Sequence, residues 1–181
     1  GIDDYHHYLA ESLYQLDNSK SIDEWVCTVE TYKYDYNFME DIYDSLREAG
    51  LYIVKRNDYL KVIETKNFDL VYPSYRYDFP ICEQKSYQTA KKLVKNGKYT
   101  LLLAKEKEIK AYILGIKGED FLWMDYLAVF EKYRNQRVGK RFLRLVLERY
   151  HTIVFECEKW DGIEGSQTQK RWLFYQNLGA R

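Results

Sequence analysis

The feature that most constrains the fold of this chain lies in residues 121–150. The segment opens with a run of aromatic and apolar residues, Phe121 to Val129, which is typical of a strand. A short polar stretch follows, and from about Val138 apolar residues recur at helical spacing with basic residues between them. The pattern predicts a strand, a basic loop and a helix N-terminus in direct succession. Free backbone N–H groups and the positive end of the helix dipole make such a corner suited to anions.

In this corner Leu127-Ala128-Val129 is followed by Arg134 and then by Gly139. These residues resemble motif A of the GNAT N-acetyltransferases, which reads Arg/Gln-x-x-Gly-x-Gly/Ala and comes a few residues after a strand that ends in small and apolar residues. Arg134 is at the first motif position and Gly139 is at the last. Arg137 then stands where the family has its middle glycine. A second alignment, Gln136-x-x-Gly139-x-Arg141, keeps the middle glycine and loses the last one.

The resemblance implies that backbone amides at this corner hold the pyrophosphate of acetyl-CoA. The cofactor-binding residues that it implies are Val129, Arg134, Asn135, Gln136, Arg137, Val138 and Gly139. Arg137 fits this position if its backbone does not need a positive φ, and its guanidinium could itself meet a phosphate. The same substitution could instead weaken cofactor binding.

Downstream residues extend the resemblance. Thr152 to Glu158 is interpreted as a second buried strand, and Ser166-x-x-Gln169 is a capping-box pattern that predicts the start of a helix. The run Arg171 to Gly179, RWLFYQNLG, resembles the end of the family's motif B, in which a Phe-Tyr pair precedes Leu-Gly. Phe79 to Glu83 also resembles the Phe-Pro-x-x-Glu segment on the acceptor side of one bacterial branch. The likeness covers about residue 59 to the C-terminus.

The family's reaction is a direct attack of an amine on the thioester, which requires a base, an oxyanion donor and an acid. The resemblance makes Tyr175 the candidate acid and a backbone N–H near Val129 the oxyanion donor. The candidate bases are carboxylates: Glu83, Asp125, Glu156 and Glu158, of which Glu83 and Asp125 are favoured. A water-mediated base also fits.

Purely structural roles are also open for the same residues. Tyr175 could be a core aromatic, because the chain has 19 tyrosines. The strand carboxylates could form ion pairs with Arg134, Arg137 or Arg171, and Glu83 could be solvated or cap the helix near Ser86.

The charge of the chain is strongly asymmetric although its net charge is zero. Residues 1–50 carry 12 acidic and three basic side chains, a formal charge of −9, and the remainder therefore carries +9. The basic part suits an anionic ligand such as coenzyme A. Three predicted helices before a hairpin also allow a winged-helix DNA-binding module, but the negative charge of residues 1–50 disfavours binding to phosphates.

The remaining patterns predict an α/β (α+β layered) fold with a central mixed sheet flanked by helices. Residues 1–50 form an acidic helical extension with helices starting near Asp3 or Asp4, Ser21 and Asn37, and residues 51–181 form the GNAT-like domain. A hairpin over 51–64, an aromatic loop over 66–85, a helix from Ser86 and strands over 99–104 and 109–115 complete the order. The family adds two strands after its motif B helix, which this sequence lacks, and we expect the 51–64 hairpin to lie near that edge.

Cysteine and histidine patterns indicate no metal site. Cys27, Cys82 and Cys157 are scattered and are expected to be reduced and structural. No apolar run is long enough to span a membrane, and a cytoplasmic location is expected. The expected partners are a small-molecule or peptide amine acceptor, with no nucleic acid and no membrane; a homodimer stays open. The rival function is a degenerate, non-catalytic module of the same fold, used for regulation or partner binding.

Overall fold

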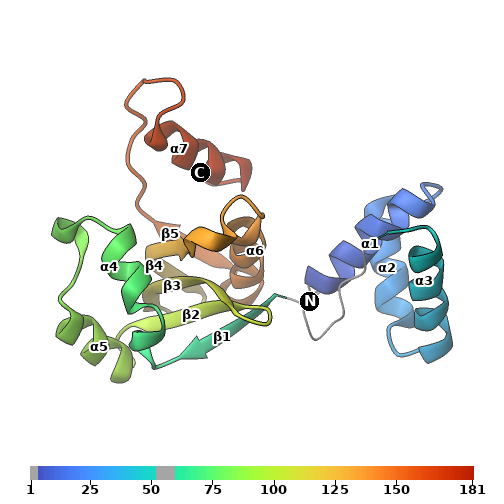
Figure 1. Ribbon diagram of the computed structural model, residues 1–181, viewed down its shortest axis with the longest axis horizontal. Coiled ribbons are helices and arrows are strands. Elements are labelled where there is room, and N and C mark those ends of the chain that lie inside the picture. Colours follow the sequence, from blue (N-terminus) through green and yellow to red (C-terminus); the bar gives the residue numbers. More distant parts are fainter. Residues whose placement is uncertain (1–3, 52–59) are drawn as a thin grey trace.

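The structure is a computed structural model that describes residues 4–51 and 60–181. Three helices precede a five-stranded sheet that has further helices around it (Figure 1). The helices are α1 (Asp4–Leu16), α2 (Ile22–Tyr32), α3 (Tyr36–Glu48), α4 (Tyr72–Asp78), α5 (Tyr87–Lys95), α6 (Val138–Tyr150) and α7 (Gln167–Asn177). The strands are β1 (Lys61–Thr65), β2 (Thr100–Lys105), β3 (Ile109–Lys117), β4 (Phe121–Val129) and β5 (Thr152–Phe155). The predicted mixed α/β architecture is confirmed.

The three N-terminal helices pack around a core of their own. That core consists of buried side chains from all three helices: Tyr5, Leu9, Leu13, Val29, Ile42 and Leu46. Helix α2 begins with the predicted capping box, in which the Ser21 hydroxyl accepts from the Glu24 N–H and the Glu24 carboxylate accepts from the Ser21 N–H. These reciprocal bonds satisfy two backbone donors that the helix itself leaves without partners.

The start of α3 differs from the prediction. The helix begins at Tyr36 with Asp35 as its N-cap, rather than at a cap on Asn37, and the Asp35 carboxylate accepts from the Phe38 N–H at 3.0 Å. Aspartate and asparagine cap helices about equally well. The sequence therefore offers two start sites, and the upstream one is used.

The sheet has the strand order β1-β2-β3-β4-β5. Strands β1 to β4 form an antiparallel meander, whereas β5 is parallel to β4 and is reached through α6. The β4–β5 pairing covers only Phe121 to Met124 of β4, opposite Thr152 to Phe155. Strand β4 continues to Val129. Beyond Met124 the two strands separate, and we call this opening the splay.

A β-bulge in β4 lies at the start of the splay. In the register with β3, Tyr126 lies opposite Leu114 and Met124 lies opposite Gly115, so Asp125 is the extra residue. The extra residue shifts the alternation of side chains by one. Leu122 and Met124 therefore share a face of the sheet with Leu127, and not with Tyr126.

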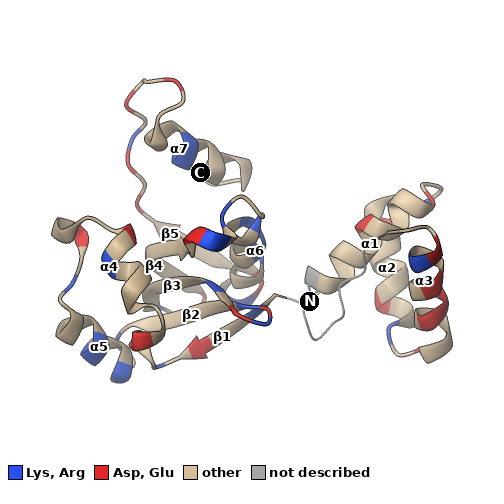
Figure 2. Cartoon of the chain, viewed as in Figure 1, with Lys and Arg blue, Asp and Glu red and all other residues tan. Residues whose placement is uncertain are grey.

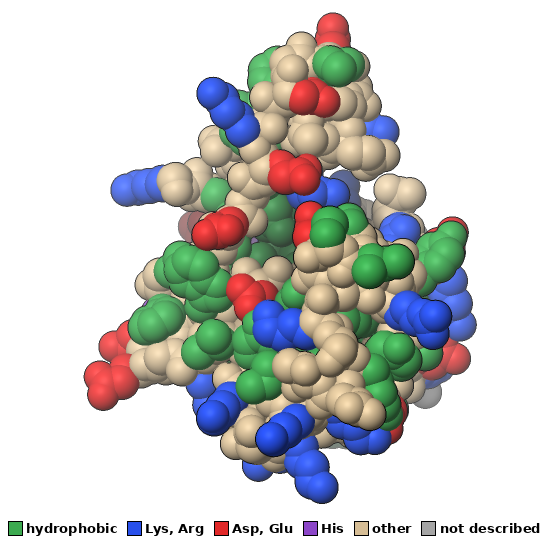
Figure 3. All heavy atoms as spheres, turned by 90° about the vertical axis from the view of Figure 1, so that its left-hand side faces the viewer, with side chains coloured by type: hydrophobic (Ala, Val, Ile, Leu, Met, Phe, Trp, Pro, Cys, Tyr) green, Lys and Arg blue, Asp and Glu red, His purple; other side chains and the backbone are tan. Residues whose placement is uncertain are grey.

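The two faces of the sheet are covered by different helices. On one face α6 buries Val138, Phe142 and Val146 against sheet residues such as Leu102 and Ile113. On the other face the core includes Phe68, Tyr75 of α4 and Val94 of α5. We call these the α6 face and the α4–α5 face. The side of the molecule formed by α4 and α5 carries hydrophobic side chains bordered by basic ones in Figure 3.

Three details of the fold correct the sequence interpretation. The segment predicted as an aromatic loop contains α4, with a proline in its first turn and Tyr75 fully buried. Strand β5 ends at Phe155 and is half-exposed rather than buried, because only one of its edges is paired. The second strand of the predicted hairpin is β1, which pairs with β2 at the edge of the sheet opposite β5. The first strand of that hairpin lies outside the described residues.

The charge asymmetry is visible in the structure (Figure 2). Acidic side chains gather on α2 and α3, whereas lysines and arginines are frequent around α5 and α6. One contact between the acidic and basic parts is a cation–π contact, in which the Arg141 guanidinium of α6 lies 5.5 Å from the ring centre of Tyr8 in α1. Among residues 4–51 and 60–181, no helix is long and apolar enough to cross a membrane.

Candidate functional site

The splayed end of β4 directs backbone amides away from the sheet. Ala111 lies opposite Val129, and the Phe130 N–H donates to the Lys110 carbonyl at 2.9 Å. Ala111 and Val129 are therefore a non-hydrogen-bonded pair of the antiparallel ladder, and the N–H of Val129 points away from β3. By the same alternation the N–H of Leu127 points to that side as well. Both amides face the splay, where β5 no longer pairs with β4.

The loop after β4 leads these amides into the N-terminus of α6. A single 3₁₀ turn, Glu131–Tyr133, is followed by Asn135 and Arg137 with φ of 62° and 60°. The first backbone bond of the helix runs from the Arg141 N–H to the Arg137 carbonyl at 3.1 Å. The N–H groups of Val138, Gly139 and Lys140 precede that bond. A left-handed turn before free helical N–H groups forms a concave set of donors suited to phosphate oxygens.

Arg137 takes the backbone conformation of a glycine. Its φ of 60° and ψ of 17° lie in the left-handed region, where it serves as the N-cap residue of α6. The sequence-based condition for Arg137 at this position, that its backbone does not need a positive φ, is therefore wrong. The alignment that places Arg137 at the middle glycine of motif A is favoured, because this position has the φ that glycine adopts without strain.

Gly139 is favoured by close packing rather than by its backbone angle. A Cβ at Gly139 would lie 3.3 Å from Cζ of Phe174 and 3.5 Å from Cγ2 of Val129. The first turn of α6 thus lies against both the end of β4 and helix α7. The last glycine of motif A brings three elements together at the corner.

Arg134 connects the corner to α4. Its Nε donates to the Val129 carbonyl at 3.0 Å, and its Nη2 donates to Asp78 at 2.9 Å. Asp78 is largely buried and also accepts from the Ser74 hydroxyl at 2.6 Å. The guanidinium of Arg134 therefore fixes the loop to β4 and α4. The expected pairing of Arg134 with a strand carboxylate is replaced by this ion pair with Asp78.

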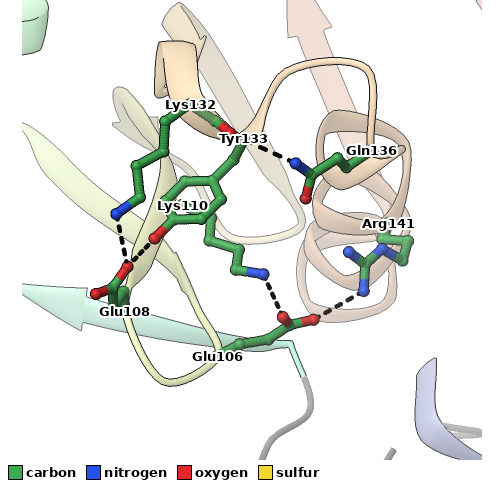
Figure 4. Close-up of polar contacts among 7 residues, drawn as sticks. All are labelled: Glu106, Glu108, Lys110, Lys132, Tyr133, Gln136 and Arg141. Carbon is green, nitrogen blue, oxygen red and sulfur yellow. Dashed lines mark hydrogen bonds and ion pairs between the residues drawn. The ribbon is translucent and has the colours of Figure 1, made fainter.

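The tip of the β2–β3 hairpin holds the other side of the same loop (Figure 4). Glu106 accepts from Arg141 of α6 at 2.9 Å and from Lys110, while Glu108 accepts from the Tyr133 hydroxyl and pairs with Lys132 at 3.1 Å. Burial raises the pKa of Glu106, but the hydrogen bonds from Lys110 and Arg141 outweigh it and hold the pKa below its ordinary value of 4.5. The sequence shows a charged tip but not which residues it contacts, because these lie up to 35 positions away.

Tyr175 of α7 lies on the β5 side of the splay. Its ring packs 4.2 Å from the ring of Phe155, centre to centre, at the end of β5. Burial, followed by the proximity of Cys157, raises the pKa of Tyr175 to about 12. The phenol is therefore protonated throughout the physiological range. Tyr175 is half-buried at the edge of the α6-face core, so its candidate role as an acid and its packing role coexist.

The candidate bases lie in different environments. Asp125, the bulge residue, is exposed rather than buried in an apolar strand; its carboxylate accepts from the Tyr99 hydroxyl and from Trp123 Nε1 at 2.8 Å. Glu83 is exposed, and its backbone carbonyl accepts from the Tyr126 hydroxyl. Both therefore belong to one region beside β4. Sequence reasoning did not identify Tyr99, Trp123 and Tyr126 as its other members.

The two remaining carboxylates are less well placed. Glu156 and Glu158 are exposed in the segment after β5, and Glu158 pairs with Arg171 of α7 at 3.4 Å, as one of the purely structural roles predicts. Cys27, Cys82 and Cys157 are all exposed and free, so the expectation that they are structural is wrong. Within the described ranges, no group of three or more His, Cys, Asp or Glu side chains could hold a metal ion.

Comparison with protein families decides the assignment. The sequence model described as "Acetyltransferase (GNAT) family" matches residues 65–180, which is more than half of the chain. The chain belongs to the GNAT acetyltransferase family. The matched GNAT domain contains the whole sheet beyond β1, both flanking layers, and the splay and corner described above.

A solved structure with a TM-score above 0.5 agrees with this assignment at the level of the fold. A protein of the GNAT family from Bacteroides thetaiotaomicron aligns with a TM-score of 0.54 and 19% identity, covering 65% of this chain and 69% of that one. An aminoglycoside acetyltransferase from an uncultured soil metagenomic sample aligns with a TM-score of 0.48 and 14% identity, covering 68% and 90%. A ribosomal-protein-alanine N-acetyltransferase from Brucella melitensis biovar Abortus 2308 aligns with a TM-score of 0.48 and 11% identity, covering 65% of this chain and 89% of that one. No curated protein matches the chain significantly.

The GNAT assignment identifies the domain as an acyltransferase whose family uses acetyl-CoA as the donor. The corner fits such a donor on three observations. Two strand amides face the splay, the first turn of α6 contains no acidic residue, and the basic residues Arg137 and Lys140 stand at the N-terminal end of the helix. An anionic pyrophosphate is favoured by each of these.

Proposed function

We propose that this protein is an N-acetyltransferase that moves an acetyl group from acetyl-CoA to a primary amine by direct attack. The observation that carries the proposal is the pair of donor sets at the two ends of one loop. The N–H groups of Leu127 and Val129 face the splay, and after a 3₁₀ turn whose own amides are bonded internally, the left-handed loop leads to the free N–H groups of α6. Two such sets of fixed donors can hold an elongated ligand with a carbonyl at one end and phosphates at the other.

The residues of the chain have separate tasks in this proposal. The amides of residues 135–139, with Arg137, hold the pyrophosphate, and Arg134 keeps the loop in place through Val129 and Asp78. An N–H of β4 at the splay donates to the thioester carbonyl oxygen, where negative charge develops. Acetyl-CoA supplies a thioester, which is more easily attacked by an amine than an amide is. No covalent bond to the protein is needed.

Asp125 is favoured over Glu83 as the group that takes the amine proton. Asp125 lies in the strand itself, at the start of the splay, and its orientation is fixed by Tyr99 and Trp123. Glu83 lies in a loop and contributes its backbone carbonyl to Tyr126. An ionised aspartate has lone pairs left after accepting two hydrogen bonds, so it can accept a proton directly or through one water molecule.

Tyr175 donates a hydrogen bond to the leaving sulfur in the proposed mechanism. A phenol whose pKa is about 12 is protonated at neutral pH, as this role requires. Its weak acidity opposes complete proton transfer, so Tyr175 stabilises the thiolate chiefly by a charge-assisted hydrogen bond. The thiolate is then protonated by solvent.

A thiol-release assay with a panel of primary amines tests this function. The panel contains an aminoglycoside, a polyamine, free amino acids and short peptides, since the acceptor class is open. We expect at least one amine to release free coenzyme A thiol and gain an acetyl group. We expect Tyr175→Phe to slow the reaction by about 10- to 100-fold, the effect of losing one hydrogen bond to a charged sulfur, while acetyl-CoA binding changes little. Acetyl-CoA binding without turnover on any amine would favour the rival function, a non-catalytic GNAT module.

A further inference from the structure

A lysine of this chain already occupies an aromatic and acidic environment beside β4. The Lys85 ammonium lies 5.0 Å from the ring centre of Tyr99 and 5.8 Å from that of Tyr126. The Tyr99 hydroxyl is bonded to the carboxylate of Asp125. Aromatic faces attract a cation through the ring quadrupole, and a nearby carboxylate adds to that attraction. The environment therefore suits a primary alkylammonium group.

The backbone around Lys85 is fixed in place. The Lys85 N–H donates to the hydroxyl of Tyr75, a fully buried residue of α4, at 2.7 Å. The Glu83 carbonyl accepts from the Tyr126 hydroxyl, and Gln84 Nε2 donates to the Arg76 carbonyl at 2.9 Å. These bonds tie the segment to both α4 and β4. The position of the Lys85 backbone beside the rings is thus set by several contacts and not by one.

The splay connects this environment to the phosphate-binding corner. Tyr99 and Tyr126 belong to the core of the α4–α5 face, whereas α6 and its N-terminus lie on the opposite face. The sheet opens between β4 and β5 beyond Met124, directly beside Asp125. Tyr126 is followed by Leu127, whose N–H faces that opening. A thioester reaching the splay from the α6 face would meet an amine presented from the α4–α5 face.

We propose that Lys85 occupies the acceptor subsite of the free protein and is acetylated there by its own chain. The inference rests on the proposed function, because it requires acetyl-CoA bound at the corner. It adds that the subsite is built for a primary alkylammonium group, and that an external acceptor must displace Lys85 or follow its acetylation. Acetylation would remove the charge that the rings attract.

The Lys85 ammonium first loses one proton through Asp125 to solvent, which leaves a neutral amine with a free lone pair. Its Nζ attacks the thioester carbonyl carbon, a C–N bond forms and the C–S bond breaks. The nitrogen loses a second proton, and the thiolate of coenzyme A gains one. The products are an acetylated Lys85, free coenzyme A thiol and one proton released to solvent.

The test is peptide mapping by mass spectrometry after the full chain is incubated with acetyl-CoA. Lys91 is a matched internal control, because its ammonium also lies over a tyrosine ring, Tyr87 at 5.2 Å, and beside a carboxylate, Asp69 at 3.0 Å, but on α5. We expect Lys85 to be acetylated at least about tenfold faster than Lys91, since it is held beside the donor. We also expect the rate to be independent of protein concentration, as an intramolecular step requires.

Variants separate this inference from the proposed function. Lys85→Arg keeps a cation over the rings but cannot accept the acetyl group at neutral pH, and Asp125→Asn is expected to slow Lys85 acetylation without preventing acetyl-CoA binding. If acetyl-CoA binds but Lys85 reacts no faster than Lys91, or only in a concentration-dependent way, the inference is overturned and the proposed function stands. If acetyl-CoA does not bind, both fail.

A second measurement needs no acetyl-CoA. A methylene group over an aromatic face shifts upfield in the NMR spectrum, so the Lys85 Hε protons should lie upfield of those of exposed lysines. The shift should be lost in Tyr99→Leu, and the Lys91 protons should not change. An unshifted Lys85 in the folded, unliganded chain would show that the ammonium does not occupy the subsite and would contradict the inference.

Discussion

At the scale of single residues, Arg137 is the largest departure from motif A. Its backbone conformation is the one that explains the glycine of the motif at this position. Its backbone is left-handed, a state that costs an ordinary residue about 1–2 kcal/mol relative to glycine. The side chain that replaces glycine adds a positive charge beside the N-terminus of α6. The two effects, backbone strain and charge, can be separated by two substitutions at this one position.

Arg137→Ala and Arg137→Gly both remove the charge, but only glycine relieves the backbone. We expect the glycine variant to have a free energy of unfolding about 1 kcal/mol higher than the alanine variant, since its greater freedom in the unfolded chain offsets part of the gain. Urea denaturation of the two variants measures the difference. Equal stabilities would contradict a left-handed residue at this position.

The guanidinium of Arg137 is expected to assist phosphate binding. Both variants should bind acetyl-CoA more weakly than the natural chain, by about tenfold for one lost charge-assisted hydrogen bond. Calorimetry measures the dissociation constants. Tighter binding by the glycine variant would show instead that the arginine obstructs the corner.

At the scale of elements, the β2–β3 hairpin and α6 are coupled through Glu106. Both partners of Glu106 are cations, Lys110 and Arg141, and all three side chains are mostly buried. We expect Glu106→Gln to lower the free energy of unfolding by about 1–3 kcal/mol, because it weakens the charged hydrogen bonds that two mostly buried cations donate to this carboxylate. Glu64→Gln is a matched control. Its ion pair with Lys117 is half-exposed and should contribute about 0–1 kcal/mol.

The same carboxylate predicts a pH dependence. The pKa of Glu106 is held below 4.5 in the folded chain by Lys110 and Arg141, against the opposing effect of burial. Its contribution to stability is therefore complete above the unfolded pKa of about 4.5 and is lost as the pH falls through the lower folded value. We expect the stability difference between the natural chain and Glu106→Gln to shrink below that pH. A constant difference measured by denaturation down to pH 3 would contradict the ion pair.

Elements that are regular in sequence could be predicted, and irregular ones could not. Strand β4 and helix α6 were predicted at residues 121–129 and from Val138 because their apolar patterns are long. The bulge at Asp125 was missed, although the change of phase between Met124 and Leu127 is its signature. Helix α4 was missed because it is short and aromatic; Pro73 in its first turn was the available signal.

In the candidate site, the backbone donors could be predicted from the sequence and the contacts of the supporting side chains could not. The backbone donors are contiguous in the sequence and could be located from motif A alone. The side chains that hold them are not contiguous with them. Asp78 reaches Arg134 across 56 positions, and Glu106 reaches Arg141 across 35. Such pairs follow from how the elements pack, which a single sequence does not state.

At the scale of the whole molecule, an acidic group of helices and a basic acyltransferase domain share one chain. The division into residues 1–50 and 51–181 remains a proposal, supported by the separate core of α1 to α3. The local charge of the second part predicts that acetyl-CoA binding weakens with salt, because ions screen the attraction beyond about 10 Å at 0.1 M. Calorimetry at several salt concentrations measures this. An affinity that does not change with salt would show that phosphate contacts contribute little.

The central claim is that the corner between β4 and α6 binds acetyl-CoA, and calorimetric titration of acetyl-CoA into the full chain tests it most directly. We predict saturable binding at one site, strongly weakened by Arg134→Glu, which places a negative charge beside Asp78 and releases the Val129 carbonyl. Arg149→Glu is the control, because Arg149 also donates to a backbone carbonyl, that of Val62, but from the other end of α6. Binding that survives Arg134→Glu, or no binding by a folded chain, would contradict the account.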